Sequence, residues 1–232
     1  LHSKFAWNDH FSGTPEATFA RTKYNSRQIP SGLCVYVSDC LFNSCTSSSD
    51  GGALYCSTSI TFLLIESSSF FSCKTSSSNG GAIYFTNTNS GQCVLHEVCG
   101  FDCISTFTSS TSYGQFARVD VNNGITSKNY VIYSSIVRCV SDYTNPYDAL
   151  CLYYGKIYCP SINSSMNKCR LYSGIRCLPF SDSSSVTCSL LYSSFLDNKA
   201  SYSICIRFDR TGANSEIKYC NIIRNTQVEL NT

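Results

Sequence analysis

Few side chains in this sequence are placed to carry out acid–base chemistry. The pairs that come closest are Arg118 with Asp120, Asp209 with Arg210, and His96 with Glu97. Cleavage of a polysaccharide needs two carboxylates, or an acidic calcium site with a nearby basic residue, on one face of the protein. Adjacent strand residues such as His96 and Glu97 point to opposite faces, and we expect both Arg/Asp pairs to lie at solvent-exposed strand edges. We therefore predict no catalytic residue.

The sixteen cysteines could act as metal ligands, nucleophiles or disulfide partners. The chain has only three histidines, His2, His10 and His96, and no Cys-x-x-Cys pair, so the spacing predicts no metal or cofactor site. A cysteine nucleophile needs a histidine beside it in the fold, and the sequence nominates no such pair. The cysteine content favours an oxidised, extracellular protein with disulfides. The alternative is a reduced interior in which free thiols stack as small apolar side chains.

The composition excludes several classes of function. Charged residues make up 14% of the chain and apolar residues 43%, which indicates a folded protein with a polar, nearly neutral surface. The formal net charge is +2 and there is no run of Lys or Arg, so we expect no nucleic-acid partner. The longest apolar stretch, near residues 62–65, is too short for a transmembrane segment. The chain begins at Leu1 rather than Met, as a secreted protein would after loss of a signal peptide.

A repeated stretch organises the chain. Residues 45–56 read CTSSSDGGALYC and residues 73–85 read CKTSSSNGGAIYF, so Gly51 and Gly80 occupy equivalent positions. Their separation of about 30 residues is typical of stacked repeat proteins, in which each unit buries its apolar face against the next. The paired glycines predict a sharp bend and a close approach between the backbones of adjacent units.

A column of anchor residues extends this repeat along the chain. Each anchor is the Cys or Asn that ends a tetrapeptide, and six of the seven tetrapeptides begin with a large apolar residue. The anchors are Cys45, Cys73, Cys103, Cys139, Cys169, Asn198 and Asn225. Their spacing keeps to the same period, with one longer interval between Cys103 and Cys139. Ten or eleven residues before an anchor, the sequence predicts a second column, formed by Cys34, Cys93, Cys159 and Cys188. Stacked residues lie about 4.8 Å apart, so a pair such as Cys159/Cys188 could bond or merely pack.

Short apolar runs between the anchors predict strands. The runs are four to seven residues long, rich in Ile, Val, Tyr, Phe and Thr, and bounded by Gly, Asn, Ser and Asp. Three such runs in each period predict one coil of a parallel β-helix. We therefore predict an all-β fold: a right-handed parallel β-helix, or β-solenoid, of about seven coils of roughly 30 residues over 33–232, with an N-terminal cap over 1–32. The alternative is a disulfide-laced antiparallel β-sandwich.

The Gly-Gly-Ala and Phe-x-x-Asn positions resemble a known repeat. The matching segments are Gly51-Gly52-Ala53-Leu54, Gly80-Gly81-Ala82-Ile83 and the tetrapeptide from Phe195 to Asn198. Over residues 34–225 the chain is similar to the polymorphic membrane protein repeat of bacterial surface autotransporters, marked by GGA[ILV] and FxxN, and to related surface proteins of parasitic protists. The resemblance implies a right-handed parallel β-helix displayed outside the cell and used in adhesion.

These features predict a non-catalytic extracellular module with an adhesive, structural or filament-forming role and a glycan or protein as its partner. We expect the contact surface to be formed by Tyr143, Tyr147, Tyr153, Tyr154 and Tyr158, because tyrosine offers a large, stiff, amphipathic side chain. Asn163 begins an Asn-Ser-Ser sequon and predicts a glycosylation site in a loop. Open strand edges in the last coil, 217–225, predict end-to-end self-association. The alternative function is a carbohydrate-active enzyme, a polysaccharide lyase or glycosidase, with a degenerate site.

Overall fold

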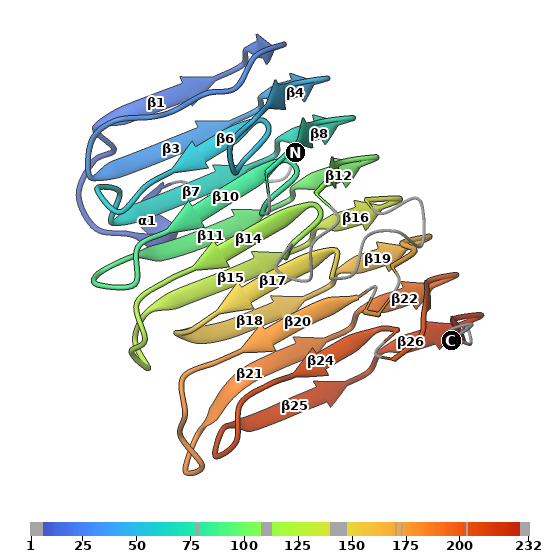
Figure 1. Ribbon diagram of the computed structural model, residues 1–232. Coiled ribbons are helices and arrows are strands. Elements are labelled where there is room, and N and C mark those ends of the chain that lie inside the picture. Colours follow the sequence, from blue (N-terminus) through green and yellow to red (C-terminus); the bar gives the residue numbers. More distant parts are fainter. Residues whose placement is uncertain are drawn as a thin grey trace, which may run out of the picture.

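The chain forms a parallel β-solenoid, in which three faces of stacked strands surround one apolar core (Figure 1). The computed structural model describes residues 7–77, 79–107, 113–139, 148–169, 171–172, 174–202 and 204–227. Every strand pair among these residues is parallel, and strands pair with their equivalents one period away, as Leu54 does with Ile83. The predicted solenoid is therefore confirmed. The antiparallel sandwich is excluded, because its strands would pair through hairpins.

Two eight-stranded sheets and one six-stranded sheet build the three faces. The first sheet contains β1 (Ala17–Ala20), β3 (Cys34–Ser38), β7 (Phe62–Glu66), β11 (Gln92–His96), β15 (Lys128–Ile132), β18 (Lys156–Pro160), β21 (Val186–Leu191) and β25 (Asn214–Lys218). The second sheet contains β2 (Lys23–Tyr24), β4 (Leu41–Asn43), β8 (Ser69–Phe71), β12 (Cys99–Phe101), β16 (Ser135–Val137), β19 (Asn163–Ser165), β22 (Ser194–Leu196) and β26 (Asn221–Ile223). The six-stranded sheet contains β6 (Leu54–Cys56), β10 (Ile83–Thr86), β14 (Ala117–Asp120), β17 (Leu150–Tyr153), β20 (Ile175–Leu178) and β24 (Ile206–Phe208).

Shorter ladders complete the coils between the second sheet and the six-stranded sheet. They are β5 (Thr46–Ser47), β9 (Lys74–Thr75) and β13 (Ile104–Ser105) in one ladder, and β23 (Lys199–Ala200) and β27 (Thr226–Gln227) in another. Because the third face has six strands, about six coils are closed on all three sides, which roughly matches the predicted seven. No helix in the described part of the chain is long and apolar enough to cross a membrane.

The described N-terminal residues belong partly to the solenoid itself. β1 pairs with β3 and β2 pairs with β4, so the range that we expected to form a cap contributes the first strand of two sheets. The helix α1 (Trp7–His10) lies against the outer face of the first sheet, where Trp7 and Phe11 pack on Leu64 and Val94 (Figure 1). Leu64 and Val94 are apolar but lie outside the main core, and the helix shields them from water.

Two sharp corners turn each coil, and each corner is one residue in the left-handed conformation. The first corner, between the first and second sheets, is formed by Arg21, Asp39, Ser67, Glu97, Tyr133, Ser161, Tyr192 and Tyr219, with φ from 46° to 57°. The second corner, after the second sheet, is formed by Ser44, Ser72, Asp102, Arg138, Met166, Asp197 and Arg224, with φ from 50° to 56°. The corner N–H donates to a carbonyl of the next coil, as Tyr192 does to Lys218 at 3.0 Å. These hydrogen bonds hold conformations that cost a non-glycine residue about 1–2 kcal/mol each.

Gly52 and Gly81 let the backbones of successive coils approach closely. A Cβ atom on Gly52 would lie 2.2 Å from the carbonyl oxygen of Gly81 and 2.4 Å from that of Lys74. A Cβ atom on Gly81 would lie 2.2 Å from the carbonyl oxygen of Gln115. The close approach predicted from the Gly-Gly-Ala repeat is therefore confirmed.

The anchor column follows the second corner, with one change from the predicted series. The strand register pairs Ser164 with Ile136 on one side and with Phe195 on the other. This register makes Asn167 the fifth anchor, so the expectation of Cys169 was wrong by two positions. The column therefore consists of four cysteines followed by three asparagines.

Asparagine and cysteine anchors both donate a hydrogen bond to a backbone carbonyl oxygen of the preceding coil. Asn198 Nδ2 donates to the carbonyl oxygen of Ser164 at 2.8 Å, and Asn198 Oδ1 accepts from the backbone N–H of Asn167 at 3.0 Å. In a cysteine coil, the thiol of Cys103 donates to the carbonyl oxygen of Phe70 at 3.3 Å. A thiol can take the place of the amide because it reaches the equivalent carbonyl, although it is the weaker donor.

All sixteen cysteines lie within the described residues in the thiol form, and twelve of them are buried. The expected disulfides are therefore not formed. The second predicted column of cysteines is also wrong, because the register pairs Cys159 with Leu190 and Cys188 with Ile157. Side chains from successive coils stack side by side, and the buried thiols pack there as small apolar groups.

We expect at most four of the sixteen thiols to be alkylated quickly in the native protein at pH 8. These are the partly exposed Cys34, Cys99, Cys205 and Cys220. Burial raises the pKa of Cys34 and Cys99, and raises that of Cys205 to about 11, so little reactive thiolate is present at pH 8 and labelling should speed up as the pH rises. Mass spectrometry after a short pulse of iodoacetamide locates the labels. Rapid labelling of Cys103 in the folded protein would contradict the buried column.

Candidate binding surfaces

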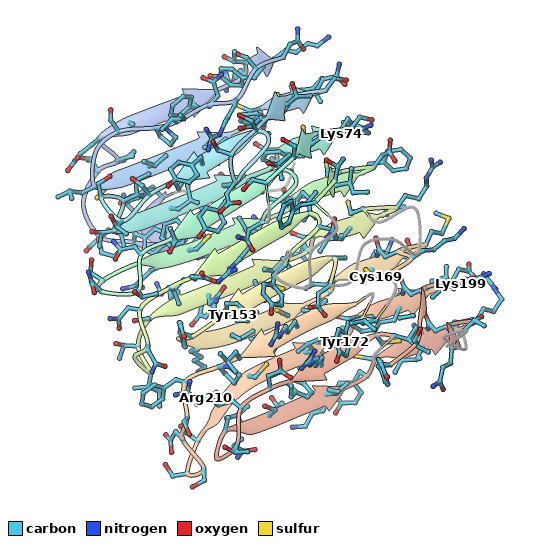
Figure 2. The ribbon with its side chains drawn as sticks, in the orientation of Figure 1. Lys74, Tyr153, Cys169, Tyr172, Lys199 and Arg210 are labelled. Atoms are coloured by element: carbon cyan, nitrogen blue, oxygen red, sulfur yellow. The ribbon has the colours of Figure 1, made fainter. Side chains whose placement is uncertain are left out.

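Arginines form a column on the outer face of the six-stranded sheet. The register places Arg118, Cys151, Arg176 and Arg207 at equivalent positions of four successive coils. Tyr153 lies over this sheet (Figure 2), with its ring centre 5.0 Å from the guanidinium carbon of Arg118 and 5.3 Å from that of Arg176. The aromatic ring therefore bridges two cations, one from the coil on each side of its own, through cation–π contacts.

Carboxylates hold these guanidinium groups in place. Asp120 Oδ2 accepts from Arg118 Nε at 3.1 Å and lies 3.0 Å from Nη2. The two oxygens of Asp209 accept from Arg176 and Arg207, each at 2.5 Å. The expectation of solvent-exposed strand edges was wrong for Asp120, which is 5% exposed. Residues two apart on a strand share a face, so Arg118 and Asp120 meet there, while Asp209 pairs with arginines of two coils.

Asp148 is a buried acid just before β17. Its side chain is 1% exposed, and burial raises its pKa to about 7 against the opposing effect of Arg176 and Arg207. The thiol of Cys151 donates to Asp148 Oδ2 at 3.6 Å. A general acid must come within hydrogen-bond reach of the atom that it protonates. A carboxyl group this deeply buried does not reach a polysaccharide on the surface, in spite of its suitable pKa.

We expect the stability of the protein to fall by about 2.5 kcal/mol between pH 5 and pH 8 because of the linkage between folding and the protonation of Asp148. The pKa of this carboxyl rises from its ordinary value of 3.8, which applies to the unfolded chain, to about 7 in the folded one. Between these values the folded state keeps a proton that the unfolded state has lost. The stability is therefore full at low pH and falls as the pH rises through this window. Urea unfolding at the two pH values measures the change.

The variant Asp148→Asn should lose most of this pH dependence, because it has no proton to release. Asp182→Asn is the control and should keep the wild-type dependence, because hydrogen bonds from Ser184 and Ser185 lower the pKa of Asp182 to about 2 and this carboxyl does not titrate between pH 5 and pH 8. An Asp148→Asn protein with an unchanged pH profile would show that the buried carboxyl is not the group responsible.

The remaining acid–base candidates from the sequence, His96 and Glu97, lie in different surroundings, one buried and one exposed. His96 is buried on the outer face of the first sheet, with its ring centre 6.1 Å from that of His10. Glu97 is a first-corner residue whose Oε2 accepts from the Ser67 hydroxyl at 2.8 Å. Across the described ranges, His, Cys, Asp and Glu side chains do not gather in groups of three that could hold a metal ion.

Three tyrosines are exposed at the first corner of the later coils, and we call them the tyrosine corner. Tyr133 is 57% exposed, Tyr192 is 62% exposed and Tyr219 is 72% exposed. Tyr192 and Tyr219 lie on successive coils and stack with their ring centres 5.0 Å apart and their planes inclined by 10°. All three have positive φ angles, which are unusual for a bulky side chain.

The three described tyrosines of the predicted contact surface lie on different parts of the solenoid. Tyr143 and Tyr147 lie outside the described residues. Tyr153 is mostly buried on the six-stranded sheet, and Tyr154 follows it in the turn after β17. Tyr158 belongs to β18 of the first sheet, a different face of the solenoid.

The sequence does carry a signal for the tyrosine corner. Tyr133 and Tyr192 are each followed by Ser-Ser, and each stands six residues before its anchor, Cys139 or Asn198. Tyr219 stands six residues before Asn225 in the same way. A search for residues at a fixed distance from the anchors would therefore have aligned all three.

The predicted glycosylation residue, Asn163, lies in a strand and not in a loop. It is the first residue of β19 and is exposed. Its Nδ2 donates to the hydroxyl of Ser135 on the preceding coil at 3.4 Å. The side chain is therefore accessible on the outer face of the second sheet, beside the tyrosine corner.

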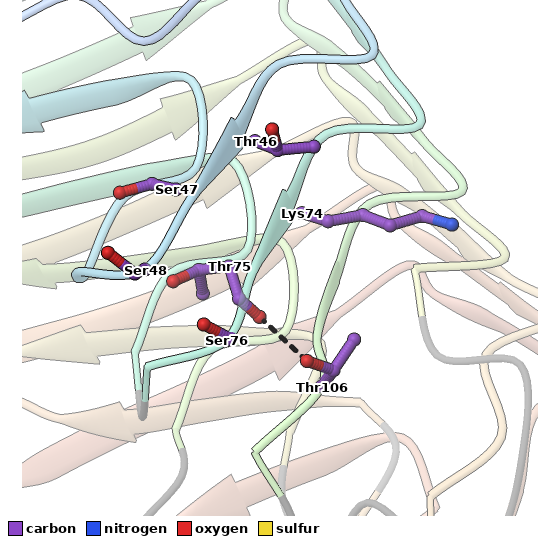
Figure 3. Close-up of a pocket in the computed structure, with 7 residues that line it drawn as sticks. All are labelled: Thr46, Ser47, Ser48, Lys74, Thr75, Ser76 and Thr106. Carbon is purple, nitrogen blue, oxygen red and sulfur yellow. Dashed lines mark hydrogen bonds between the residues drawn. The ribbon is translucent and has the colours of Figure 1, made fainter.

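A shallow groove of about 390 Å³ follows the ladder β5, β9 and β13 (Figure 3). Three successive coils supply its lining: Thr46, Ser47, Ser48, Lys74, Thr75, Ser76 and Thr106. The hydroxyl of Thr106 donates to the carbonyl oxygen of Thr75 at 3.2 Å. Figure 3 shows the Lys74 side chain extending away from the hydroxyl groups. The groove therefore presents hydroxyl groups with little charge.

Comparisons with protein-family models, with curated proteins and with solved structures found no match for this chain. The resemblance to the polymorphic membrane protein repeat therefore stays a prediction that rests on the Gly-Gly-Ala and Phe-x-x-Asn positions. The fold is a parallel β-solenoid, and its function has to be argued from its surfaces.

Proposed function

We propose that this chain is a non-catalytic extracellular module that adheres to glycans through the tyrosine corner. The observation that carries the proposal is the exposure of Tyr133, Tyr192 and Tyr219 in left-handed conformations. Each conformation costs about 1–2 kcal/mol, and little of each side chain is buried in return. The corner needs a left-handed residue but does not need a tyrosine.

A glycan fits this surface better than a charged ligand does. The stacked rings of Tyr192 and Tyr219 form an apolar strip with hydroxyl groups at its edge, and a sugar ring likewise combines an apolar face with a rim of hydroxyls. The neighbouring second sheet adds uncharged hydrogen-bonding groups from Ser135, Asn163 and Ser194. Tyrosine gives such contacts at a low cost in conformational entropy.

The charged face of the six-stranded sheet supports binding or bracing more than catalysis. Asp120 and Asp148 are 5% and 1% exposed, and Asp209 accepts from two arginines. Asp120 and Asp209 order the guanidinium groups. All three carboxyl groups are poorly placed to donate or accept protons at a substrate. The enzyme alternative therefore has a suitable pKa at Asp148, but this carboxyl is buried away from a substrate on the surface.

A glycan array tests the proposal, with the double variant Tyr192→Ala/Tyr219→Ala beside the wild type. We expect the variant to lose at least about tenfold in affinity for the bound glycans, because aromatic contacts dominate such interfaces. Tyr202→Ala is the matched control, since Tyr202 is also 61% exposed but lies outside the tyrosine corner. Cleavage of a uronic-acid polymer that is abolished by Asp120→Asn would replace this proposal with the enzyme alternative.

Location outside the cell is part of the proposal and needs its own test. Sixteen reduced thiols by themselves favour a reducing compartment, but buried thiols are shielded from oxidants and pack as apolar groups in either compartment. Labelling of intact source cells with a membrane-impermeant amine reagent should tag the protein. Tagging only after lysis would contradict the extracellular location.

Self-association is a second candidate, favoured by the exposed edges of β25 and β26. β25 and β26 each end their sheet, and Ile217 and Ile222, which continue core columns, are 44% and 58% exposed. Unpaired strand edges with apolar side chains promote stacking. Sedimentation velocity should show assembly that grows with concentration and is blocked by Ile222→Lys. A monomer at all concentrations would contradict this structural role.

A further inference from the structure

A groove of about 430 Å³ lies at the second corner of the later coils and is rich in cations. It is lined by Arg138, Met166, Lys168, Asp197 and Lys199, and we call it the basic groove. Arg138, Met166 and Asp197 are second-corner residues of three successive coils. Lys168 and Lys199 follow the corner on neighbouring coils and pair through a parallel bridge. Figure 2 shows Lys199 at the edge of the rod, away from Tyr153 on the six-stranded sheet.

The backbone of the basic groove is held firmly, so its lysines are fixed in neighbouring positions. The N–H of Lys199 donates to the carbonyl oxygen of Asn167 at 2.9 Å, and the N–H of Cys169 donates to the carbonyl oxygen of Lys199 at 3.0 Å. Asn167 is itself an anchor with a buried side chain. Adjacent rungs of a sheet lie about 4.8 Å apart. Like charges at neighbouring positions on a sheet repel each other.

The positive charge of the basic groove is only partly compensated. Three cations and one carboxylate line it, a formal charge of +2, which equals the net charge of the whole chain. Asp197 accepts from Arg224 Nε at 2.8 Å and from Nη2 at 2.9 Å, and these hydrogen bonds lower its pKa. Within the described part of the chain, neither Lys168 nor Lys199 has a carboxylate at ion-pair distance. An anion in the groove would relieve the repulsion between them.

The basic groove lies beside the surface assigned to glycans. In one coil, β16 (Ser135–Val137) separates Tyr133 at the first corner from Arg138 at the second. In another coil, β22 separates Tyr192 from Asp197 in the same way. The outer face of the second sheet, with its uncharged serine and asparagine side chains, therefore joins an aromatic strip to a cationic groove.

We propose that the basic groove binds the acidic substituents, sulfate or carboxylate, of a linear polysaccharide whose sugar rings stack on the tyrosine corner. This inference rests on the proposed glycan-binding function and names the ligand class as acidic glycans. A sulfated or uronate-containing chain supplies both requirements, because it carries anions at intervals along a chain of rings. A nucleic acid is the poorer match, since a regular phosphate backbone calls for a longer run of cations than this corner provides.

The test uses the whole chain produced in bacteria that attach no N-glycan, so that the second sheet is uncovered and the Asn163 side chain is kept. Binding is measured by isothermal titration to heparin, to polygalacturonate and to a neutral dextran, at low and moderate salt. Lys168→Gln/Lys199→Gln removes the groove lysines. Lys23→Gln/Lys74→Gln is the matched control, because it removes two lysines from exposed strand positions in earlier coils. Circular dichroism confirms that each variant is folded.

We expect at least a tenfold loss of affinity for an acidic polysaccharide in Lys168→Gln/Lys199→Gln, a weaker salt dependence, and little change in the control. Binding to heparin alone assigns the anion as sulfate, and binding to polygalacturonate alone assigns it as carboxylate; either supports the proposal. Equal losses in both double variants would overturn it as non-specific attraction. If dextran binds with the same affinity to the wild type and to both double variants, the acidic-ligand inference is overturned. The proposed glycan-binding function would still hold. If the wild-type protein binds none of the three polymers and no member of the glycan array, both the acidic-ligand inference and the proposed function are overturned.

Discussion

Gly52→Ala is expected to lower the free energy of unfolding by at least about 3 kcal/mol, the upper end of the usual cost of overpacking. The new Cβ would meet the carbonyl oxygens of Gly81 and Lys74 at 2.2 and 2.4 Å. Both contacts are with backbone of the next coil, which cannot rotate away as a side chain can. Relief requires that the coils separate, which stretches hydrogen bonds such as that from Gly52 N–H to Gly80 O, 3.2 Å long.

Urea unfolding followed by circular dichroism measures the effect, with Gly124→Ala as the control. Gly124 has a φ outside the left-handed region, as Gly52 does, but the nearest atom to its new Cβ is a side-chain oxygen of Asn122 at 2.8 Å. That side chain can move, so the control should stay within about 0.5 kcal/mol of the wild type. Equal effects of the two substitutions would show that close packing of the coils is not what requires Gly52.

Asn198→Leu is expected to cost about 4 kcal/mol, because it removes an amide whose hydrogen bonds serve three coils. The substitution leaves the N–H of Asn167 and the carbonyl oxygen of Ser164 without their partner, and both groups are buried. It also removes the bond from Asn198 Nδ2 to Asn225 Oδ1 at 3.0 Å. Each buried polar group left unsatisfied costs about 1–3 kcal/mol, whereas the leucine side chain adds little apolar burial in an already filled column.

Asn198→Cys provides an internal comparison, since four earlier coils have cysteine at this position. The thiol can still donate to the carbonyl oxygen, as Cys103 does, so we expect a loss of only about 1–2 kcal/mol. The order of stability should be wild type, then Asn198→Cys, then Asn198→Leu, measured by the urea midpoint. Equal stability of the leucine and cysteine variants would show that the amide hydrogen bonds do not hold the column.

The architecture could be predicted from the sequence because each coil repeats its own chemistry. Gly51 and Gly80 set the period, and anchors such as Cys73 and Asn198 continue it where the glycine pair is lost. These signals lie within short segments, so they can be recognised in the sequence without knowing which strands pair. The fifth anchor was missed because the segment Met166-Asn167-Lys168-Cys169 offers both residue types two positions apart. Only the register with the flanking coils distinguishes Asn167 from Cys169.

The candidate surfaces could be predicted less well, for two physical reasons. The pairing of Asp209 with Arg176 joins residues 33 positions apart, so it depends on the exact number of residues in a coil and on loops of unequal length. The tyrosine corner depends on a left-handed backbone, and tyrosine does not signal that conformation as glycine or asparagine would. The predicted surface around Tyr153 grouped residues that are close in the sequence. The exposed rings of Tyr192 and Tyr219 are 27 residues apart and meet only because successive coils stack.

The parallel stacking of the coils also determines how this rod would respond to force. The hydrogen bonds between coils run along the rod, as in the pairing of Leu54 with Ile83, so tension applied to its two ends loads the coils in series. The weakest coil then detaches while the others stay folded. One detached coil of about 30 residues releases roughly 100 Å of chain at about 3.4 Å per residue. Pulling on single molecules should give a sawtooth with steps of that length, so the rod would lengthen under load by one coil at a time.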